Sequence, residues 1–350
     1  WFAPAAGSGN STVRLCGQSV PMGTHLLFDT PETCFGVEIA DDAWTATPPS
    51  SMMALNGAEI IFNLSAHVES IGKYEYLHTL IKQQSARCLA GYVCASCGFG
   101  ESTTDMVFGG NGLIYENGSL LAEAERFVFK EQLVISEIDV EFLRNERKAN
   151  SLFAANRANC PVQDYTHIST ELTGIRDLML TRPVEAHPFV PKGDELNKRC
   201  EEIFAIQVAG LAQRLTHINC KTVVVGISGG LDSTLALLVC AKTFDKLELP
   251  RKGIIGITMP GFGTTDRTYN NALHLMSSLG ITMKEISIKD ACIQHFKDIE
   301  HDMTIHDVTY ENSQARERTQ ILMDYANKVN ALVIGTGDLS ELALGWATYN

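Results

Sequence analysis

Short apolar runs alternate with stretches of helical periodicity in the second half of the chain. Residues 222–225, 253–259, 281–288 and 331–334 are rich in Val, Ile and Leu, and this composition predicts buried strands. The stretches between them have apolar residues at helical spacing, as residues 266–279 do. Because strands that alternate with helices pair in parallel, the pattern predicts a doubly wound α/β sheet.

The first half has the same alternation at its centre. Residues 34–40, 59–64 and 90–96 predict buried strands, whereas residues 49–55 and 73–89 have helical periodicity. Shorter runs predict strands at residues 15–20, 25–28, 106–108, 111–115 and 133–140, a tight turn at 116–118 and a solvated helix at 141–155. We therefore expect an α/β sandwich whose functional groups lie at strand ends.

The pattern divides the chain into two domains and a connector. We assign residues 1–155 to the first domain, 156–194 to a polar connector and 195–350 to the second domain, which opens with an amphipathic helix. The chain begins at Trp1 rather than at a start methionine, and it stops at Asn350 directly after a motif. We therefore expect an internal piece of a longer protein, shortened at both ends.

The net charge restricts the kinds of molecule that we expect the protein to bind. The 28 Lys and Arg residues are outnumbered by 41 Asp and Glu residues, and the net charge of −13 disfavours a nucleic-acid surface. No apolar run approaches the ~20 residues of a membrane span, and the sequence has no secretory signal pattern. These observations predict a cytoplasmic protein without a nucleic-acid or membrane partner.

The ten cysteines favour free thiols over a metal clip. Several lie in apolar runs, where a small core residue is expected. Cys94 and Cys97 have metal-clip spacing, but no second Cys or His pair completes a zinc site. Free thiols in a reducing compartment are the simplest interpretation.

A glycine-rich loop joins the strand at residues 222–225 to the helix that follows. A loop that enters a helix N-terminus presents unpaired N–H groups to a phosphate, although a plain strand–turn–helix is the alternative. The loop lacks the Gly-Lys-Ser/Thr ending of the usual P-loop, and residues 228–233 instead resemble the pyrophosphate loop of ATP pyrophosphatases. We assign ATP binding to the whole loop: Gly226, Ile227, Ser228, Gly229, Gly230, Leu231, Asp232 and Ser233.

Polar groups also follow the other predicted strands. The carboxyl ends of parallel strands meet at one edge of a sheet, where ligands bind. Met259 at such an end suits an adenine ring, although a core methionine is the commoner meaning. Thr336 and Asp338 follow the last strand, where N-cap roles are the alternative to ligand binding. Because magnesium takes oxygen ligands, Asp232 and Glu341 are candidates to share one ion.

A charged helical string precedes the last strand. Residues 310–318 place Asn312 and Arg316 near one helix face, where the fork of an arginine suits phosphates. A solvated helix with salt bridges is the alternative interpretation.

Strings in both halves resemble one known family. Residues 36–44, 62–66 and 98–105 resemble the carbon–nitrogen hydrolase (nitrilase) domain, whose fold is an α-β-β-α sandwich. Residues 310–318 and 335–349, with the glycine-rich loop, resemble the synthetase domain of NAD synthetase, a Rossmann-like fold of the adenine nucleotide alpha hydrolase type. The domain order is that of the glutamine-dependent NAD synthetase family, and the likeness covers nearly the whole chain.

The resemblance implies a ligase reaction and a set of contacts. ATP adenylates the nicotinate carboxylate of deamido-NAD with release of pyrophosphate, and ammonia drawn from glutamine then displaces AMP. The glycine-rich loop and Thr336 would bind ATP together with Mg²⁺. The implied deamido-NAD contacts are Asn312, Arg316, Glu341, Trp346, Ala347, Thr348 and Tyr349.

The first domain departs from the family pattern at its nucleophile. Nitrilase-like glutaminases use a Glu, a Lys and a nucleophilic Cys; Ala40 occupies the position of the Cys, and the Glu and Lys would precede the first residue. His67 replaces a serine expected to contact glutamine, whereas Lys73 matches a basic residue that can hold the glutamine carboxylate. Cys94 and Cys97 fall elsewhere in the pattern and make poor substitutes.

Three functional interpretations follow. The first is NAD synthesis with free ammonia, because Ala40 removes the glutaminase nucleophile. The second is a non-catalytic fragment or pseudo-amidotransferase with an assembly role, since nitrilase-like domains commonly form homo-oligomers. The third is another pyrophosphate-loop amidotransferase, such as a GMP or asparagine synthetase, which residues 335–345 and the nitrilase-like domain disfavour.

Overall fold

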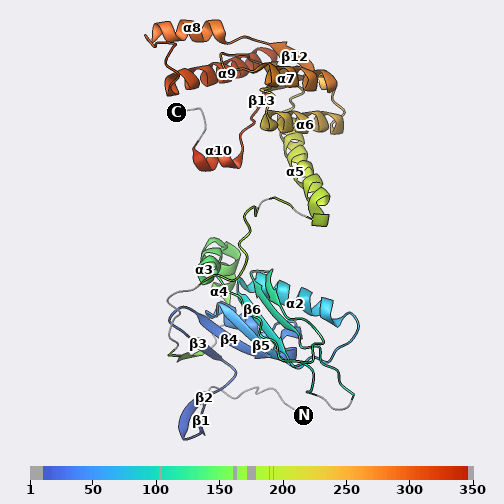
Figure 1. Ribbon diagram of the computed structural model, residues 1–350, viewed down its shortest axis with the longest axis vertical. Coiled ribbons are helices and arrows are strands. Elements are labelled where there is room, and N and C mark those ends of the chain that lie inside the picture. Colours follow the sequence, from blue (N-terminus) through green and yellow to red (C-terminus); the bar gives the residue numbers. More distant parts are fainter. Residues whose placement is uncertain are drawn as a thin grey trace. The chain divides into compact units, whose positions relative to one another are not determined.

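The computed structural model describes residues 11–101, 105–160, 164–171, 179–188, 190–191 and 193–345. The chain divides into two compact units, residues 1–186 and 187–350, coloured blue to green and yellow to red in Figure 1. Among the described residues, no helix combines the length and the apolar character that crossing a membrane demands.

A seven-stranded mixed sheet forms the centre of the first unit. The strand order is β8-β7-β6-β5-β4-β3-β9, and the central strands β4, β5 and β6 pair in parallel. The strands are β3 (Leu26–Asp29), β4 (Cys34–Ile39), β5 (Ile60–Ser65), β6 (Gly91–Ser96), β7 (Gly112–Glu116), β8 (Ser119–Glu123) and β9 (Thr166–Ser169). The three central strands agree with the apolar runs of the sequence.

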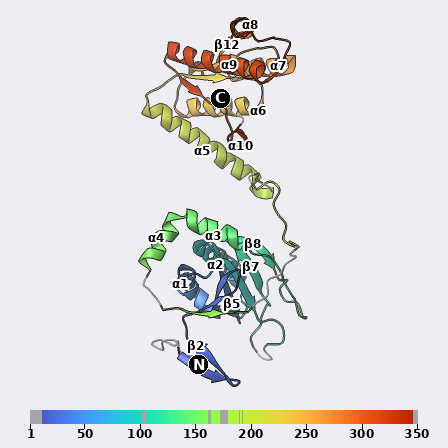
Figure 2. The same ribbon diagram turned by 90° about the vertical axis from the view of Figure 1, so that its left-hand side faces the viewer.

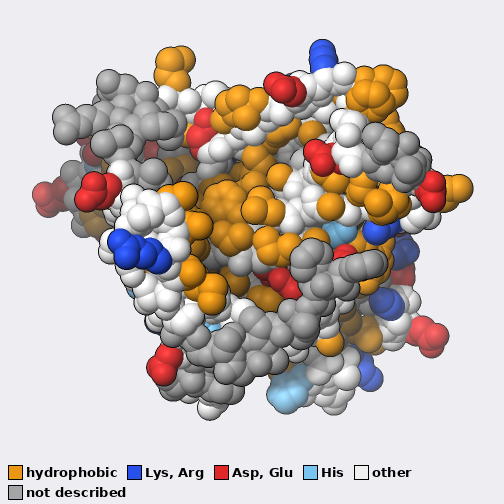
Figure 3. Space-filling model, turned by 90° about the horizontal axis from the view of Figure 1, so that it is seen from below, with side chains coloured by type: hydrophobic (Ala, Val, Ile, Leu, Met, Phe, Trp, Pro, Cys, Tyr) orange, Lys and Arg blue, Asp and Glu red, His pale blue; other side chains and the backbone are white. Residues whose placement is uncertain are grey.

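Helices α1 (Pro49–Leu55) and α2 (Lys73–Cys88) cover one face of this sheet, as Figure 2 shows. Alternate strand residues point toward these helices, and Ile61, Leu77 and Tyr92 are almost completely buried there. On the other face Ile39 and Leu64 keep more than half of their area exposed. Figure 3 shows apolar side chains gathered around a hollow on the side of the molecule that it presents.

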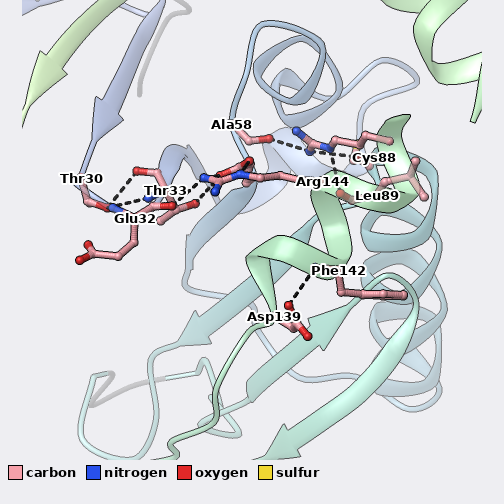
Figure 4. Close-up of polar contacts among 11 residues, drawn as sticks. Thr30, Glu32, Thr33, Ala58, Cys88, Leu89, Asp139, Phe142 and Arg144 are labelled. Atoms are coloured by element: carbon pink, nitrogen blue, oxygen red, sulfur yellow. Dashed lines mark hydrogen bonds and ion pairs between the residues drawn. The ribbon is translucent and has the colours of Figure 1, made fainter. Parts of the chain in front are cut away.

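Two arginines bind helix α3 (Val140–Ala149) to the segments that precede β4, β5 and β6, and Figure 4 shows Arg144 among its partners. Arg144 Nε donates to Glu59 Oε1 at 2.6 Å, and its Nη2 donates to the carbonyl of Glu32 at 2.6 Å. The side chain of Arg147 donates to three backbone carbonyls, those of Ala58, Cys88 and Leu89. The predicted solvated helix is thus packed through part of its length, and Asn150 divides it from α4 (Ser151–Asn159).

Two strand predictions in the first unit were wrong. Residues 133–139 form no strand; Glu137 accepts hydrogen bonds from the backbone of Thr181 and Arg182, and Ile138 packs over Gly91. Residues 15–20 contain a turn, because the left-handed pair at 16–17 separates two strands. Those strands are β1 (Ser11–Leu15) and β2 (Gln18–Met22).

The hairpin of the first unit is shifted along the chain from its predicted place. Strands β7 and β8 pair around Asn117 and Gly118, both with positive φ, where a turn was predicted. A third strand prediction, residues 106–108, was also wrong, because these residues contribute only an isolated bridge between Phe108 and Val68. Strand β9, within the stretch predicted as a connector, pairs in parallel with β3.

The second unit contains a four-stranded parallel sheet of order β12-β11-β10-β13, which confirms the doubly wound fold. Its strands are β10 (Val223–Gly226), β11 (Ile254–Thr258), β12 (Thr282–Glu285) and β13 (Leu332–Ile334). Its helices are α5 (Leu196–His217), α6 (Leu231–Lys246), α7 (Asp266–Ser278), α8 (Lys289–Asp298), α9 (Val308–Val329) and α10 (Leu339–Leu344). Strand β12 covers only the middle of the predicted stretch 281–288, and α8 begins directly after that stretch, at Lys289.

Both faces of the second sheet are buried. Val223, Val225 and Phe244 belong to the apolar cluster on one face, and Val224 and Phe296 belong to the cluster on the other. Because both faces are buried, these strands appear in the sequence as continuous apolar runs. It also leaves the carboxyl ends of the strands as the place for polar chemistry.

Candidate functional site

The glycine-rich loop forms a tight turn between β10 and α6. Gly229 has a φ of +84°, and a Cβ placed on it would lie 2.1 Å from the carbonyl oxygen of Thr268. Ser228 Oγ accepts a hydrogen bond from Gly230 N at 3.2 Å and lies 3.1 Å from Ser233 Oγ. Among the described residues, no side chain caps the N-terminus of α6. The first N–H groups of α6 are therefore left for a ligand.

A cavity of about 850 Å³ opens beside this loop, at the carboxyl ends of the strands. Six of the ten residues predicted to bind ATP line it: Gly226, Ile227, Ser228, Ser233, Met259 and Thr336. Gly229, Gly230, Leu231 and Asp232 belong to the same turn but do not line the cavity. Strands β10, β11 and β13 thus bring together residues that are distant in the sequence.

One row of α9 residues lines the cavity and was missed by the sequence analysis. Tyr310, Gln314 and Arg318 are spaced by four residues and so share a helix face. Arg318 Nε donates to the carbonyl of Met259 at 3.2 Å, and burial lowers the pKa of this arginine. Phe262 N donates to Gln314 Oε1 at 3.2 Å. The spacing of Tyr310, Gln314 and Arg318, four positions apart, was the sequence signal that would have identified these cavity residues.

The residues predicted to bind deamido-NAD are brought together less closely than those predicted to bind ATP. Asn312 is half-buried and Arg316 is exposed, and neither lines the cavity. Glu341 and Asp338 form a capping box at the start of α10, with Glu341 N donating to Asp338 Oδ1 at 2.7 Å. The N-cap interpretation of Asp338 is therefore correct. Trp346, Ala347, Thr348 and Tyr349 lie outside the described residues.

In the first unit, Ala40 lies on a strained turn at the end of β4. Its φ is +44°, a left-handed conformation that is unfavourable for a residue with a Cβ. A 3₁₀ helix, η1 (Ala40–Trp44), begins there. In α/β-hydrolases a sharp strand-to-helix turn of this kind exposes the nucleophile. The turn at Ala40 also joins a strand to a helix, and its side chain is a methyl group.

Neighbouring polar side chains hold this turn. Asn63 Nδ2 donates to the carbonyl of Ala40 at 3.2 Å, and Ser65 Oγ donates to Asn63 Oδ1. Buried Glu38 accepts hydrogen bonds from Tyr92 Oη and from Ser50 N. Asn63 and Ser65 thus tie the end of β5 to the turn at Ala40.

The side chain of His67 packs against the 3₁₀ helix η1, which begins at Ala40. This side chain is 4% exposed, and it contacts Trp44, whose Nε1 lies 3.5 Å from His67 Nε2. Burial, and then the charge of Lys73, lower the pKa of His67, so the imidazole is neutral at pH 7. Lys73 Nζ donates to the carbonyl of Val68 at 3.0 Å. The cavity that remains among these residues is about 10 Å³, room for about one water molecule.

Cys94 and Cys97, the two cysteines of the metal-clip spacing, are poor candidates for a nucleophile. Cys94 is almost completely buried, and burial raises its pKa to about 11. Burial also raises the pKa of Cys97. Both thiols are therefore protonated at neutral pH and poor nucleophiles.

Comparisons with known proteins identify a family for each part of the chain. The carbon-nitrogen hydrolase family matches residues 1–148, and the NAD synthase family matches residues 203–350. The "Glutamine-dependent NAD(+) synthetase" of Mycobacterium tuberculosis is 43% identical, with 99% of this chain and 53% of that protein covered. The protein of the same name from Mycobacterium leprae is 42% identical, with 97% and 52% covered.

A third relative matches the second unit alone. The "NH(3)-dependent NAD(+) synthetase" of Pyrobaculum aerophilum is 35% identical, with 42% of this chain and 54% of that protein covered. The chain spans about half the length of these relatives. Two domains in this order, together with the identity along nearly the whole chain, settle its classification. The chain belongs to the family of glutamine-dependent NAD(+) synthetases.

Proposed function

We propose that the second unit binds ATP in the 850 Å³ cavity and uses it to amidate deamido-NAD, with free ammonia as the nitrogen source. The observation that carries the proposal is the glycine-rich loop opening into this cavity at the N-terminus of α6. The names of the relatives supply the reaction class.

The cavity supplies what the transfer of an adenylyl group needs. Uncapped N–H groups of α6 and the guanidinium of Arg318 offset phosphate charge, and Met259 offers an apolar surface for adenine. An oxygen of the nicotinate carboxylate attacks the α-phosphorus, and pyrophosphate leaves. The nitrogen of ammonia then attacks the activated carbonyl, AMP leaves with its oxygen, and a proton is released. The protein contributes positioning and charge stabilisation.

The residues present fit a magnesium ion that accompanies ATP. Asp232 lies exposed in the first turn of α6, next to the uncapped N–H groups. Mg²⁺ usually needs only one or two carboxylates besides water and phosphate oxygens. Asp232 would therefore hold it, with Glu341 as the second carboxylate after release from its capping box. Bound there, the ion would neutralise charge on the phosphates.

Asp232→Ala is expected to weaken magnesium-dependent ATP binding about ten-fold, because one charged ligand is lost, worth about 1.4 kcal/mol. Isothermal titration calorimetry with ATP and Mg²⁺ measures this change. Asp290→Ala is the matched control, since Asp290 is also an exposed carboxylate in the first turn of a helix, α8. An ATP affinity that Asp232→Ala leaves unchanged would refute the assignment.

Alanine at Asn312 or Glu341 is expected to raise the apparent KM for deamido-NAD more than that for ATP. The motivation is that both residues lie in the strings that separate this family from other pyrophosphate-loop enzymes. Steady-state kinetics of a version with the length of its relatives would measure both constants. Asn327→Ala, on an exposed position of α9, serves as the control. Equal effects on both substrates would argue against this division of roles.

For the first unit we propose a glutaminase that has lost its activity. Ala40 offers no nucleophile, and His67 leaves almost no space at the predicted glutamine site. A homo-oligomeric assembly in a reducing cytoplasm completes the proposal; the described residues contain no disulfide, as such a compartment favours. AMP formation that depends on both deamido-NAD and ammonium would support the ligase. A folded chain that forms no AMP would favour the assembly role instead.

A further inference from the structure

Three side chains of the metal-binding types meet at one corner of the first sheet. They are Asp29 at the end of β3, Cys34 at the start of β4 and His167 in β9. Each offers one ligand atom, and these atoms all lie within 4.8 Å of one another. Cys34 and Ala40 are at opposite ends of β4, about 20 Å apart for a strand of this length. The cluster is therefore separate from the site around Ala40.

Strand pairing brings the three residues to the same face of the sheet. Asp29 is the direct antiparallel partner of Cys34, and directly paired side chains share a face. His167 pairs with Leu27, two residues before Asp29, and so lies on that face as well. The carbonyl of Asp29 accepts a hydrogen bond from Thr170 N at 2.8 Å, which fixes β9 in register.

The donor set is typical of zinc. A thiol, an imidazole and a carboxylate suit Zn²⁺, whereas Mg²⁺ and Ca²⁺ prefer oxygen ligands alone. His167 Nδ1 lies 2.9 Å from one oxygen of Asp29 and 3.2 Å from the other. Two ligands about 2.0–2.1 Å from zinc at the tetrahedral angle lie about 3.3 Å apart. Little movement is therefore needed for both to bind one ion.

The surroundings leave the cluster open to an ion and to water. The side chains of His167 and Asp29 are 47% and 39% exposed. Glu59, a further carboxylate whose charge acts on Cys34, is held by Arg144 and by Thr33 Oγ1. Three protein ligands and one water molecule would complete a tetrahedral site.

We propose that Asp29, Cys34 and His167 bind a zinc ion that fastens β9 to the sheet. Strand β9 is four residues long and, of the strands that the structure describes, pairs with β3 alone. His167 is separated from Asp29 by 138 positions in the sequence. A metal ion bound by both residues would close the long chain segment between them. It would also hold β9, the last strand of this sheet in chain order.

Cobalt titration of the 350-residue chain tests the proposal. Co²⁺ in a site with a thiolate is expected to give a sulfur-to-metal charge-transfer band in the near ultraviolet and visible bands of tetrahedral cobalt. One equivalent of Zn²⁺ should abolish both, and Zn²⁺ should raise the Tm. An absence of the charge-transfer band would overturn the proposal without any variant.

Variants identify the ligands. Cys34→Ser and His167→Gln are each expected to weaken Zn²⁺ binding at least ten-fold in competition with a chromophoric chelator. Because His167 is half exposed, His167→Gln should leave the fold intact, as circular dichroism can check. Cys97→Ser, another half-buried cysteine of the same unit, should leave the affinity unchanged. Equal Zn²⁺ affinity in the wild type and in Cys34→Ser would show that Cys34 is not a ligand and would overturn the proposed site.

Discussion

Glutamate release from glutamine is expected to stay at the background rate, because residue 40 carries a methyl group where covalent catalysis needs a thiolate. The turn around it is intact: Ala40 has the left-handed φ, and Asn63 holds its carbonyl. Cys94 and Cys97 keep protonated thiols at neutral pH and give no substitute nucleophile. We therefore expect the loss to be complete rather than partial.

Restoring the thiol separates loss of the nucleophile from loss of the pocket. The measurement is glutamate release by a version with the length of its relatives, carrying the Glu and Lys that the family uses. Ala40→Cys should restore turnover only together with His67→Ser, since His67 leaves a cavity of about 10 Å³. Ala40→Ser is the matched control, because a hydroxyl of similar size is a weaker nucleophile. Turnover with Ala40 itself would contradict the prediction.

Gly229→Ala is expected to lower ATP affinity at least ten-fold and to destabilise the second unit. The left-handed φ of +84° costs about 1–2 kcal/mol for a residue with a Cβ. In addition, the new methyl group would lie 2.1 Å from the carbonyl oxygen of Thr268, so the start of α7 must move. The loop would then open, and the N–H groups of α6 would lose their arrangement.

The control for this substitution is another glycine of the same cavity. Gly263 lines the cavity, has no positive φ, and has nothing within 4 Å of a Cβ placed on it. Gly263→Ala should therefore change stability little. Thermal unfolding and ATP titration of both variants measure the difference. Equal behaviour of the two variants would mean that the conformation of Gly229 is unimportant for the loop.

The sequence was most informative where one local pattern determines the structure. Continuous apolar runs such as Val223–Gly226 and Ile254–Thr258 predicted the buried parallel strands, because a strand covered on both faces has no polar alternation. The glycines of the loop predicted a tight turn. The structure has this turn, and at Gly229 it leaves no room for a Cβ. Several loop residues and Thr336 met in one cavity because parallel strands end at a common edge.

Features that depend on pairing between segments distant in the sequence could not be predicted from the local pattern. Leu133 and Ile135 resembled a strand, yet their segment finds no strand partner and both side chains are exposed. The cluster of Asp29, Cys34 and His167 depends on β9 pairing with β3, which no local signal indicates. Arg318 had a local signal in its spacing from Tyr310, but the charge pattern directed attention to Arg316.

The source of the amide nitrogen tests the central claim most directly. A version with the length of its relatives is incubated with ATP, Mg²⁺, deamido-NAD, ¹⁵N-ammonium and unlabelled glutamine, and the NAD is analysed by mass spectrometry alongside the AMP released. We predict one AMP per NAD and ¹⁵N in every newly formed amide. Unlabelled NAD amide would reveal an active glutaminase, and folded protein that releases no AMP would contradict the assignment of the second unit as an NAD synthase.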